Sequence, residues 1–242
     1  MKSLKDILNK SLLNESLLNE SLLDDEDELF DRNDKTLIEL WIKENYKIYG
    51  TLKIYEDKHG FVADSDADVE VTNKDIKSLT NGMFRWGEIM GRFNCEKCKK
   101  LTSLEGAPEK CNNFDCSGCD ELISLKGAPK KCDSFYCFEC TELRSLEDAP
   151  NECWGCFNCS ECIKLTSLKG TPSECEWFDC SGCTELRTLK GAPNKCNSFD
   201  CSECTGLRTL EGAPNKCNQI ECNSCPNLTI TDNERKKYKI RS

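Results

Sequence analysis

Histidine is almost absent from this chain of 242 residues, in which His59 is the only one. A single imidazole excludes most catalytic schemes that pair His with Ser or Cys, and most metal sites that mix His with Cys. The sequence also has no P-loop, no G-x-G-x-x-G after a strand and no nucleophile elbow. We therefore expect a protein that is not an enzyme.

Basic residues are in deficit and long apolar runs are missing. The chain has 33 Lys+Arg against 43 Asp+Glu, a net charge of −10, which argues against a nucleic-acid partner. The mean hydropathy is −0.60 and no apolar run approaches the roughly 18 residues of a membrane span. Lys2, Lys5, Asp6 and Lys10 interrupt the early apolar positions, so we expect no secretory signal peptide. The composition favours a soluble, acidic, intracellular protein.

Cysteine is confined to one region: none precedes Cys95 and none follows Cys225, yet the chain has 21. There a unit of 21 residues recurs, with one 22-residue copy near Cys153–Cys156. Its consensus is F-x-C-x-x-C-x-x-L-x-S/T-L-x-G-A-P-x-x-C-x-x. A fixed period of this length is the signature of a stacked repeat protein.

Four columns of the repeat carry its aromatic and sulfur-containing residues. The apolar column is Phe93, Phe114, Phe135, Phe157, Phe178, Phe199 and Ile220. The first cysteine column is Cys95, Cys116, Cys137, Cys159, Cys180, Cys201 and Cys222. The second is Cys98, Cys119, Cys140, Cys162, Cys183, Cys204 and Cys225. The third is Cys111, Cys132, Cys153, Cys175, Cys196 and Cys217, which leaves only Cys156 outside the repeat.

A unit this short cannot bury its own apolar face, so copies must stack. The spacing of Phe and Cys predicts a short strand, and the Gly and Pro of G-A-P predict the turn that closes each coil. We predict a mainly β, right-handed solenoid of six to seven coils over residues 93–230. An α+β cap over residues 35–92 precedes it and leads into a degenerate first coil, in which Asn73, Ile76 and Leu79 keep the spacing of Cys98, Leu101 and Leu104. A basic tail over residues 231–242 follows.

The stretch C-x-x-F-x-C-x-x-C-x-x-L resembles the L-x-x-L-x-L-x-x-N/C-x-L pattern of leucine-rich repeats, with Cys119 and its column at the Asn/Cys position. The fit needs one extra residue before the last apolar position. C-x-x-L-x-S-L-x-x-x-P also resembles treponemal-type leucine-rich repeats. L-T-S-L-E-G-A-P followed by F-x-C-S is similar to tandem units in proteins of gut bacteriophages, including crAss-like phages. The resemblance covers about residues 93–230 and implies a solenoid, a fold that serves many functions.

Three interpretations of the cysteines remain open. We favour small buried hydrophobic side chains stacked in columns, some of which donate S–H to loop carbonyls. Alternatively, Cys95–Cys98 with Cys116–Cys119, and the equivalent pairs, fit a template for zinc and would also suit copper(I) or an iron–sulfur cluster. A repeat produces this spacing automatically, however. The third interpretation is disulfides between coils, which a reducing compartment opposes.

Residues 1–34 combine helical apolar spacing with an acidic run, and we predict a flexible helical and acidic leader. Its start, M-K-S-L-x-x-x-I, resembles the capsid-targeting peptides of internal proteins of T-even-type phages. That resemblance implies cleavage by a prohead protease after L/I-x-E. L-N-E occurs twice, which makes Glu15 and Glu20 candidate processing sites.

In the cap, residues 35–48 have the spacing of one amphipathic helix, and residues 51–55 and 69–71 alternate as strands do. The intervening segment carries Asp64, Asp66 and Asp68, spaced like calcium ligands, but it lacks the Gly and the distal Glu of an EF-hand. We predict a solvated loop there.

Departures from the repeat indicate a binding surface. Tyr136 and Phe138 occupy positions that are polar in other coils, Trp177 replaces the usual Asn or Ser before Phe, and Trp154 lies beside the insertion. Clustered exposed aromatics are typical of protein-binding hot spots, so these four residues form a candidate partner patch. In the alternative, one or two of them pack under neighbouring loops. A second candidate surface is the acidic column of Asp115, Asp179, Asp200 and Glu221.

We therefore expect a non-enzymatic solenoid that binds a protein partner and needs no cofactor. The phage resemblance implies a bacteriophage protein, carried in the virion or acting in the cytoplasm of the bacterial host. The alternative is a cysteine-rich metal-binding or redox protein that uses the C-x2-C pairs of adjacent coils.

Overall fold

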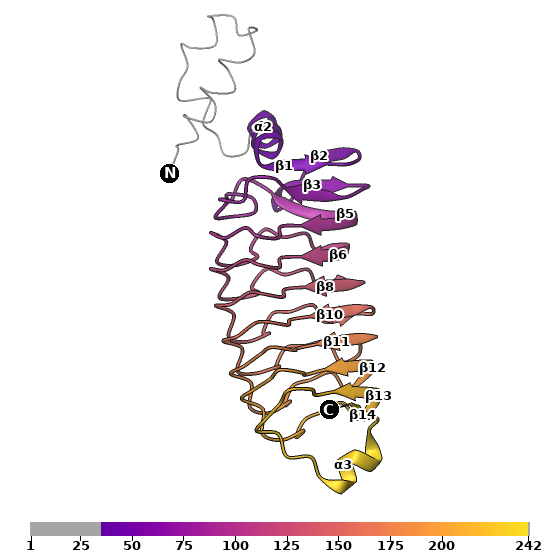
Figure 1. The fold of residues 1–242 in the computed structure, drawn as a ribbon. Helices are drawn as coiled ribbons and strands as arrows, with labels where there is room; N and C mark the ends of the chain where they lie inside the picture. Colours follow the sequence, from indigo (N-terminus) through magenta and orange to yellow (C-terminus); the bar gives the residue numbers. More distant parts are fainter. Residues whose placement is uncertain (1–34, 242) are drawn as a thin grey trace, which may run out of the picture. The chain divides into compact units, whose positions relative to one another are not determined.

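The computed structural model describes residues 35–241, which form a solenoid of stacked coils (Figure 1). Each coil adds a strand to one parallel column within a 14-stranded sheet. The strands of this column are β4 (Val69–Val71), β5 (Arg85–Asn94), β6 (Lys110–Asp115), β8 (Ser134–Tyr136), β10 (Cys156–Asn158), β11 (Trp177–Asp179), β12 (Lys195–Asp200), β13 (Lys216–Glu221) and β14 (Ile240–Arg241). The predicted mainly β solenoid is confirmed. The column includes β4, in the segment for which a degenerate first coil is predicted, and β14, in the predicted tail.

Phenylalanine rings form the core of the column. The register pairs Phe93 with Phe114 and continues, one Phe per coil, to Phe199 beside Ile220. Successive ring centroids lie 5.2–5.6 Å apart, and every ring of the stack is buried. Identical side chains at one register position, on strands spaced about 4.8 Å apart, are brought into this stacked arrangement by the backbone itself.

Two left-handed positions shape each coil. The first is the Gly of G-A-P: Gly106 has φ +89° and Gly170 has φ +104°. Asp148 replaces Gly in one coil and still takes φ +68°. The second is the residue before the second cysteine, for example Glu161 with φ +57°, whose N–H donates to the carbonyl of Ser181 at 2.7 Å. Both turns recur because each coil must close on the same path as its neighbours.

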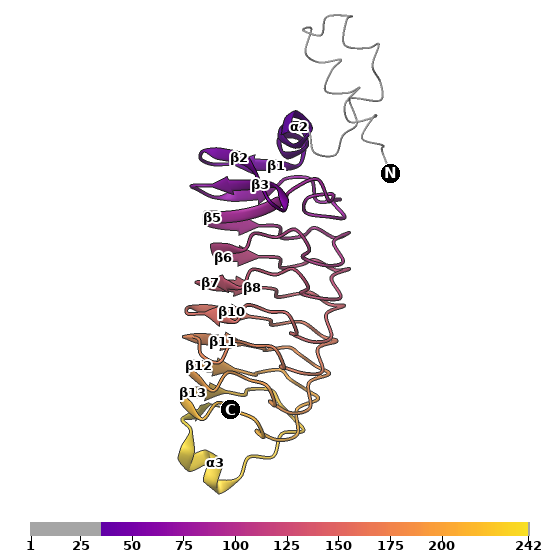
Figure 2. The ribbon, with the colours of Figure 1, turned by 180° about the vertical axis from the view of Figure 1, so that it is seen from behind.

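Lysine and glutamate side chains pair between successive coils. Lys131 of β7 (Lys131–Cys132) pairs with Glu152 of β9 (Glu152–Cys153) at 2.6 Å, and Lys169 with Glu147 at 2.8 Å. β7 and β9 form a second short ladder, and Figure 2 shows β7 beside β8. Each exposed pair stabilises the fold by at most about 1 kcal/mol, but the pairs favour stacking in register.

The N-terminal cap begins with α2 (Lys35–Asn45) and β1 (Tyr46–Ile48). The prediction of one helix over residues 35–48 is therefore too long by three residues. Asn45 ends the helix: its Nδ2 donates to the carbonyl of Trp41 at 2.8 Å, while its own carbonyl accepts from the N–H of Thr72 at 2.8 Å. Tyr46–Ile48 then pairs antiparallel with β4 and covers the first coil.

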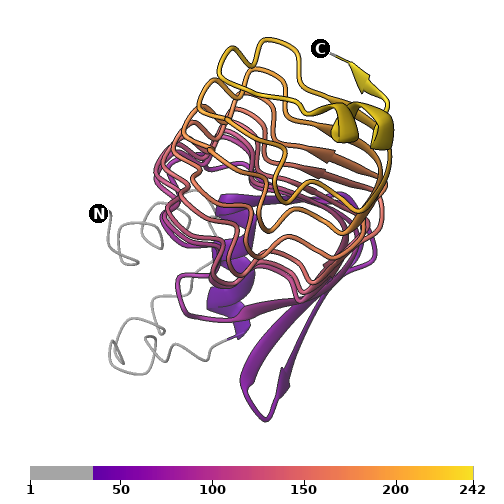
Figure 3. The same ribbon diagram turned by 90° about the horizontal axis from the view of Figure 1, so that it is seen from below.

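A β-hairpin replaces most of the predicted loop. β2 (Leu52–Asp57) pairs antiparallel with β3 (Gly60–Ser65), and β3 pairs with β5. The loop prediction was wrong for residues 60–65, because Val62 and Ala63 are buried against the sheet. Seen along the stack, this hairpin extends beyond the outline of the coils (Figure 3).

Asp66 and Asp68 lie in the short exposed segment between β3 and β4, which agrees with the predicted solvated loop, whereas Asp64 lies in β3. Each of the three carboxylates accepts a hydrogen bond from a backbone N–H. The donors for Asp64, Asp66 and Asp68 are, in that order, Glu88 (2.9 Å), Thr51 (2.7 Å) and Arg92 (2.8 Å). A glycine lies against each carboxylate, in the same order Gly87, Gly50 and Gly91. The three carboxylates thus hold the cap strands together.

The predicted basic tail forms a second cap. Thr231 and Glu234 make a capping box that starts α3 (Asp232–Lys237), and β14 then joins the sheet beside β13 (Figure 1). Tyr238 is buried, and its hydroxyl donates to the carbonyl of Pro214 at 3.0 Å. The signal for the helix was present in the sequence as T-x-x-E.

Candidate functional site

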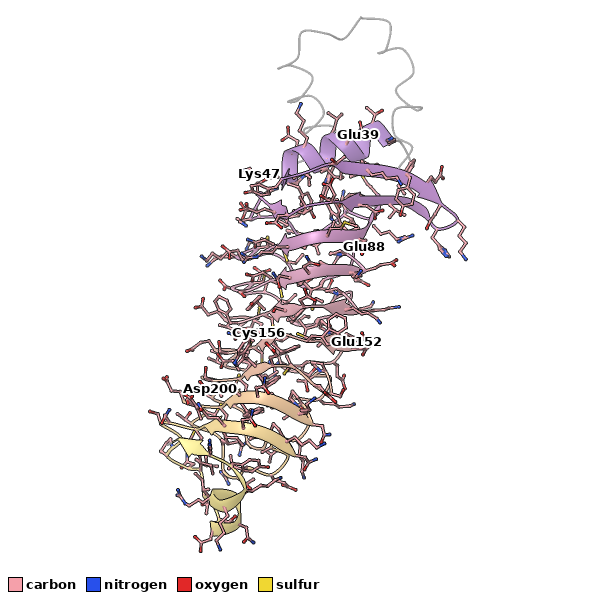
Figure 4. All side chains as sticks on the ribbon, turned by 90° about the vertical axis from the view of Figure 1, so that its right-hand side faces the viewer. Glu39, Lys47, Glu88, Glu152, Cys156 and Asp200 are labelled. Carbon is pink, nitrogen blue, oxygen red and sulfur yellow. The ribbon has the colours of Figure 1, made fainter. Side chains whose placement is uncertain are left out.

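The outer face of the strand column carries the residues on either side of each core Phe. Successive side chains of a strand point to opposite faces, so the neighbours of an inward Phe point outward. Figure 4 looks at these strands, and labels Cys156, which precedes Phe157, and Asp200, which follows Phe199. Candidate residues beside a core Phe, such as Tyr136 and Asp200, are therefore expected on this outer face.

Two tryptophans are exposed on adjacent coils. Trp177, at the start of β11, is 53% exposed, and Trp154, just before β10, is 58% exposed. The N–H of Glu176 donates to the carbonyl of Trp154 at 3.0 Å, so the two indoles come from adjacent coils. The other two tryptophans, Trp41 and Trp86, are buried in the cap. Large exposed indoles on adjacent coils are suited to contact with another protein.

A shallow cleft of about 280 Å³ opens beside Trp154. Its other walls come from the next two coils, and they are Glu174, Cys175, Glu176, Lys195 and Asn197. Lys195 pairs with Glu174 at 2.8 Å, whereas Glu176 is exposed. The cleft therefore combines one large apolar side chain with a rim that carries more negative than positive charge.

Tyr136 and Phe138 are less exposed than the tryptophans. Tyr136 lies in β8, in register with Asp115 on one side and Asn158 on the other, and Phe138 follows in the next turn. Both side chains are half-buried. Tyr136 is one coil away from the coil of Trp154, so the structure places all four candidate residues on successive coils but exposes Trp154 and Trp177 most.

The acidic column has a structural role in the coils. Carboxylates at this position accept from the N–H two residues ahead, as in Asp115 to Ser117 (3.0 Å) and Asp200 to Ser202 (2.8 Å). Asparagine does the same in the coil of Asn158, at 2.8 Å to Ser160. This Asx turn directs the chain into the following corner. Sequence reasoning treated the column as a surface and missed that role, for which D/N-x-S was the available signal.

Two members of the acidic column illustrate its electrostatics. Asp115 is only 4% exposed and pairs with Arg92, a partner that sequence reasoning did not select. The pKa of Asp179 is raised above its usual value, mainly because the carboxyl is buried. Hydrogen bonds from Ser181 lower this pKa, and the nearby carboxylates of Asp200 and Glu221 raise it further. The column therefore includes a carboxylate that is destabilised in its charged form.

The second cysteine column forms a ladder of S–H···O=C hydrogen bonds. Cys119 donates to the carbonyl of Cys95 at 3.3 Å, and Cys140 donates to that of Cys116 at 3.2 Å. The same bond joins Cys162 to Cys137, Cys183 to Cys159, Cys204 to Cys180 and Cys225 to Cys201, at 3.1–3.3 Å. Each bond links a coil to the preceding one, as expected for buried thiols that donate to carbonyls.

Burial favours the neutral form of cysteines in each of the three columns, as Cys95, Cys98 and Cys111 show. It raises the pKa of Cys98 to about 11 and that of Cys111 to about 12, and it places the pKa of Cys95 well above the usual value. Zinc binds the thiolate form. Within residues 35–241, no three His, Cys, Asp or Glu side chains are arranged to hold a metal ion. The candidate metal ligands are Cys95, Cys98, Cys116 and Cys119. Of these, the Cys119 thiol donates a hydrogen bond to the backbone carbonyl of Cys95.

The third cysteine column contains two close thiol pairs. Cys132 and Cys153 are paired and buried, and Cys153 lies 3.3 Å from the carbonyl of Cys156 in the insertion. Cys196 donates to Cys217 across a Sγ–Sγ distance of 3.4 Å, and Cys217 is partly exposed. The hydrogen bond from Cys196 lowers the pKa of Cys217 to about 7, against the opposing effect of burial. Sequence reasoning did not single out this pair.

The candidate processing sites Glu15 and Glu20, and the predicted leader over residues 1–34, lie outside the described residues. Across residues 35–241, neither helix has the length and apolar character required to cross a bilayer. Comparison with protein-family models, with curated proteins and with solved structures finds no match to this chain. Its function therefore has to be inferred from the geometry described above.

Proposed function

We propose that this protein is a non-enzymatic binding solenoid whose partner is another protein. The observation that carries the proposal is the pair Trp154 and Trp177, each more than half exposed, on adjacent coils. Exposed tryptophans are unfavourable for a protein that has no partner, and they are the residue type most enriched at binding hot spots.

The scaffold under these residues is suited to rigid display. Backbone hydrogen bonds, stacked rings and thiol–carbonyl bonds all link one coil to the next. A side chain on such a surface loses little further freedom when a partner binds, which lowers the entropic cost of association.

The partner segment should be apolar and basic. The cleft beside Trp154 offers an indole as an apolar wall and the exposed carboxylate of Glu176 at its rim. The whole chain carries a net charge of −10, which favours approach of a positively charged segment. We therefore propose an extended peptide segment with an apolar anchor next to Lys or Arg.

A displayed peptide library, selected on the full chain, tests this specificity. We expect the selected peptides to share an apolar anchor flanked by Lys or Arg. The double variant Trp154→Asn, Trp177→Ser uses residues found at these positions in other coils, so the fold should persist. Peptide affinity should fall by about 30-fold, which corresponds to about 2 kcal/mol for the loss of aromatic anchors.

The matched control is the double variant Tyr136→Asp, Phe138→Ser, which also restores residues of the repeat. If Tyr136 and Phe138 belong to the same patch, this variant should weaken binding as well; a loss confined to the tryptophan variant would limit the patch to Trp154 and Trp177. Equal affinity of both variants and the parent, with unchanged thermal midpoints, would contradict a binding site at these aromatics.

The biological setting that we propose follows from the resemblance of the repeat to leucine-rich units in gut bacteriophage proteins. It is a bacteriophage protein, present in the virion or in the host cytoplasm. Mass spectrometry of purified virions tests the first location and would also show whether the chain begins after Glu15 or Glu20. A metal-loaded protein purified without added metal would instead favour the cysteine-rich metal-binding alternative.

A further inference from the structure

The pair Cys196 and Cys217 lies where two of the last coils meet. Cys196 in β12 and Cys217 in β13 are register partners on neighbouring parallel strands. Adjacent strands are about 4.8 Å apart, inside the Cα–Cα range of about 4.4–6.8 Å in which disulfides form. The thiols already lie 3.4 Å apart, so rotation of the two side chains suffices to reach a bond of about 2.05 Å.

The environment of Cys217 differs from that of the other cysteines. Only Cys156, Cys217 and Cys225 are partly exposed. Burial raises the pKa of Cys156 and of Cys225 to about 11, whereas the hydrogen bond from Cys196 lowers that of Cys217 to about 7. Cys217 is thus the partly exposed cysteine whose pKa is lowered, which favours the thiolate, the nucleophile in disulfide exchange.

A second pair in the same column shows what the exposure adds. Cys132 and Cys153 are also register partners, and the neighbouring Cys153 thiol raises the pKa of Cys132. They are 2% and 0% exposed, so a small oxidant cannot reach either sulfur without opening the coil. The two pairs have the same chemistry and differ in access.

We propose that Cys196 and Cys217 are a thiol pair that low-molecular-weight disulfides, such as oxidised glutathione, convert to an inter-coil disulfide. The Cys217 thiolate attacks one sulfur of the oxidant, forms a mixed disulfide and releases one thiolate. That thiolate takes the proton of Cys196, and the Cys196 thiolate then attacks Cys217 Sγ and releases the second small thiolate, which takes from solvent the proton that Cys217 lost when it ionised. The pair loses two electrons and two protons, and the oxidant becomes two thiols.

The consequence is a covalent link between β12 and β13. The last coil has only the C-terminal cap beyond it, with Tyr238 bonded to the carbonyl of Pro214. A terminal coil opens more easily than a central one because it has fewer neighbours. The disulfide therefore ties down the end of the solenoid under oxidising conditions and releases it when small thiols are in excess.

Oxidised glutathione added to the reduced full chain tests the proposal, with intact mass and peptide mapping as readouts. We expect a loss of two hydrogens and a linked peptide pair containing Cys196 and Cys217, at a concentration that leaves Cys132 and Cys153 reduced. With Cys196→Ser, the reaction should stop at one glutathione adduct on Cys217. With Cys217→Ser, neither product should form, and Cys153→Ser should behave like the parent.

Iodoacetamide labelling provides a measurement that needs no variant. Cys217 should be alkylated at least about tenfold faster than Cys225, which has similar exposure and a higher pKa. Labelling of Cys225 at the same rate, adducts spread over many cysteines, or a first disulfide at another pair would each overturn the proposal.

Discussion

The cap and the coils fill their interiors with aromatic rings in two different geometries. In the cap, Trp41, Phe84 and Trp86 pack edge to face, with interplanar angles of 68° and 76°. In the coils the Phe rings are stacked, with interplanar angles of 5–25°. Phe93 belongs to both regions, at 68° to Trp86 and 5° to Phe114. Edge-to-face packing is available to rings on unlike elements, whereas rings at equal positions of equal coils share one orientation.

The two regions also satisfy backbone N–H groups in different ways. In a coil, Asp or Asn accepts from the N–H two residues ahead, and the motif repeats with the coil. In the cap, Asp64 and Asp68 accept from residues of β5 that lie 24 positions further on, and a glycine makes room for each carboxylate. Coils therefore depend on a repeated local solution, while the cap depends on pairs of residues that occur once.

The largest expected effect is on the core of central coils. Leu143→Ala or Leu165→Ala removes a fully buried side chain between two neighbouring coils and should lower the free energy of unfolding by about 2–5 kcal/mol. Leu228→Ala, in the last coil, removes a half-buried side chain and should cost much less. Thermal and urea unfolding of the reduced protein measure these losses. Equal losses at the two places would show that terminal and central coils contribute alike.

The next effect concerns the contacts that occur once, in the cap. A Cβ at Gly91 would lie 2.6 Å from the backbone N of Asp68 and 2.7 Å from the carbonyl carbon of Ala67. Gly91→Ala should therefore force strands apart and cost about 1–3 kcal/mol, the usual range for overpacking. Gly87→Ala is the matched control, because its neighbours are the side chains of Asp64 and Val62, which can shift. A larger loss for Gly87→Ala in urea unfolding would contradict this account.

Features that recur in every coil could be predicted from the sequence. The Phe column, the inward cysteines and the left-handed Gly of the closing turn each appear several times at one spacing, so a single physical argument covers them all. The exposure of Trp154 and Trp177 was predictable because both depart from a column that is polar in other coils.

Features that depend on one pair of distant residues could not be predicted in the same way. β3 pairs with β5 because Val62 and Ala63 are buried there, and its short F-V-A run resembles many loop segments. Glu139 and Glu161 have positive φ and occupy a position that is Gly in two other coils. Periodicity alone does not distinguish these two residues from ordinary turn residues. The contact between Cys196 and Cys217 depends on side-chain rotation, while all third-column cysteines look equal in sequence.

The smallest expected effect tests the acidic column of the coils. Asp179→Asn keeps the Asx turn, as Asn158 does in the preceding coil, and removes a charge that is buried and faces Asp200 and Glu221. Because the pKa of Asp179 is raised in the folded chain, its protonation stabilises the fold at low pH, and this contribution is lost as the pH rises through the folded pKa. Asn should therefore stabilise the protein at pH 7 by about 0.5 kcal/mol, the size of a cross-strand like-charge repulsion.

The pH dependence separates this explanation from a general effect of Asn. Below the usual Asp pKa of 3.8 both residues are neutral, so the advantage of Asp179→Asn should vanish there. Asn158→Asp is the companion variant: a carboxylate replaces the Nδ2–H that donates to Asp179 Oδ2 at 3.4 Å, so this variant should destabilise the protein more at pH 7 than at low pH. Urea unfolding at several pH values measures both differences. An advantage of Asn that persists at low pH would show that hydrogen bonding in the turn, and not charge in the column, limits stability at this position.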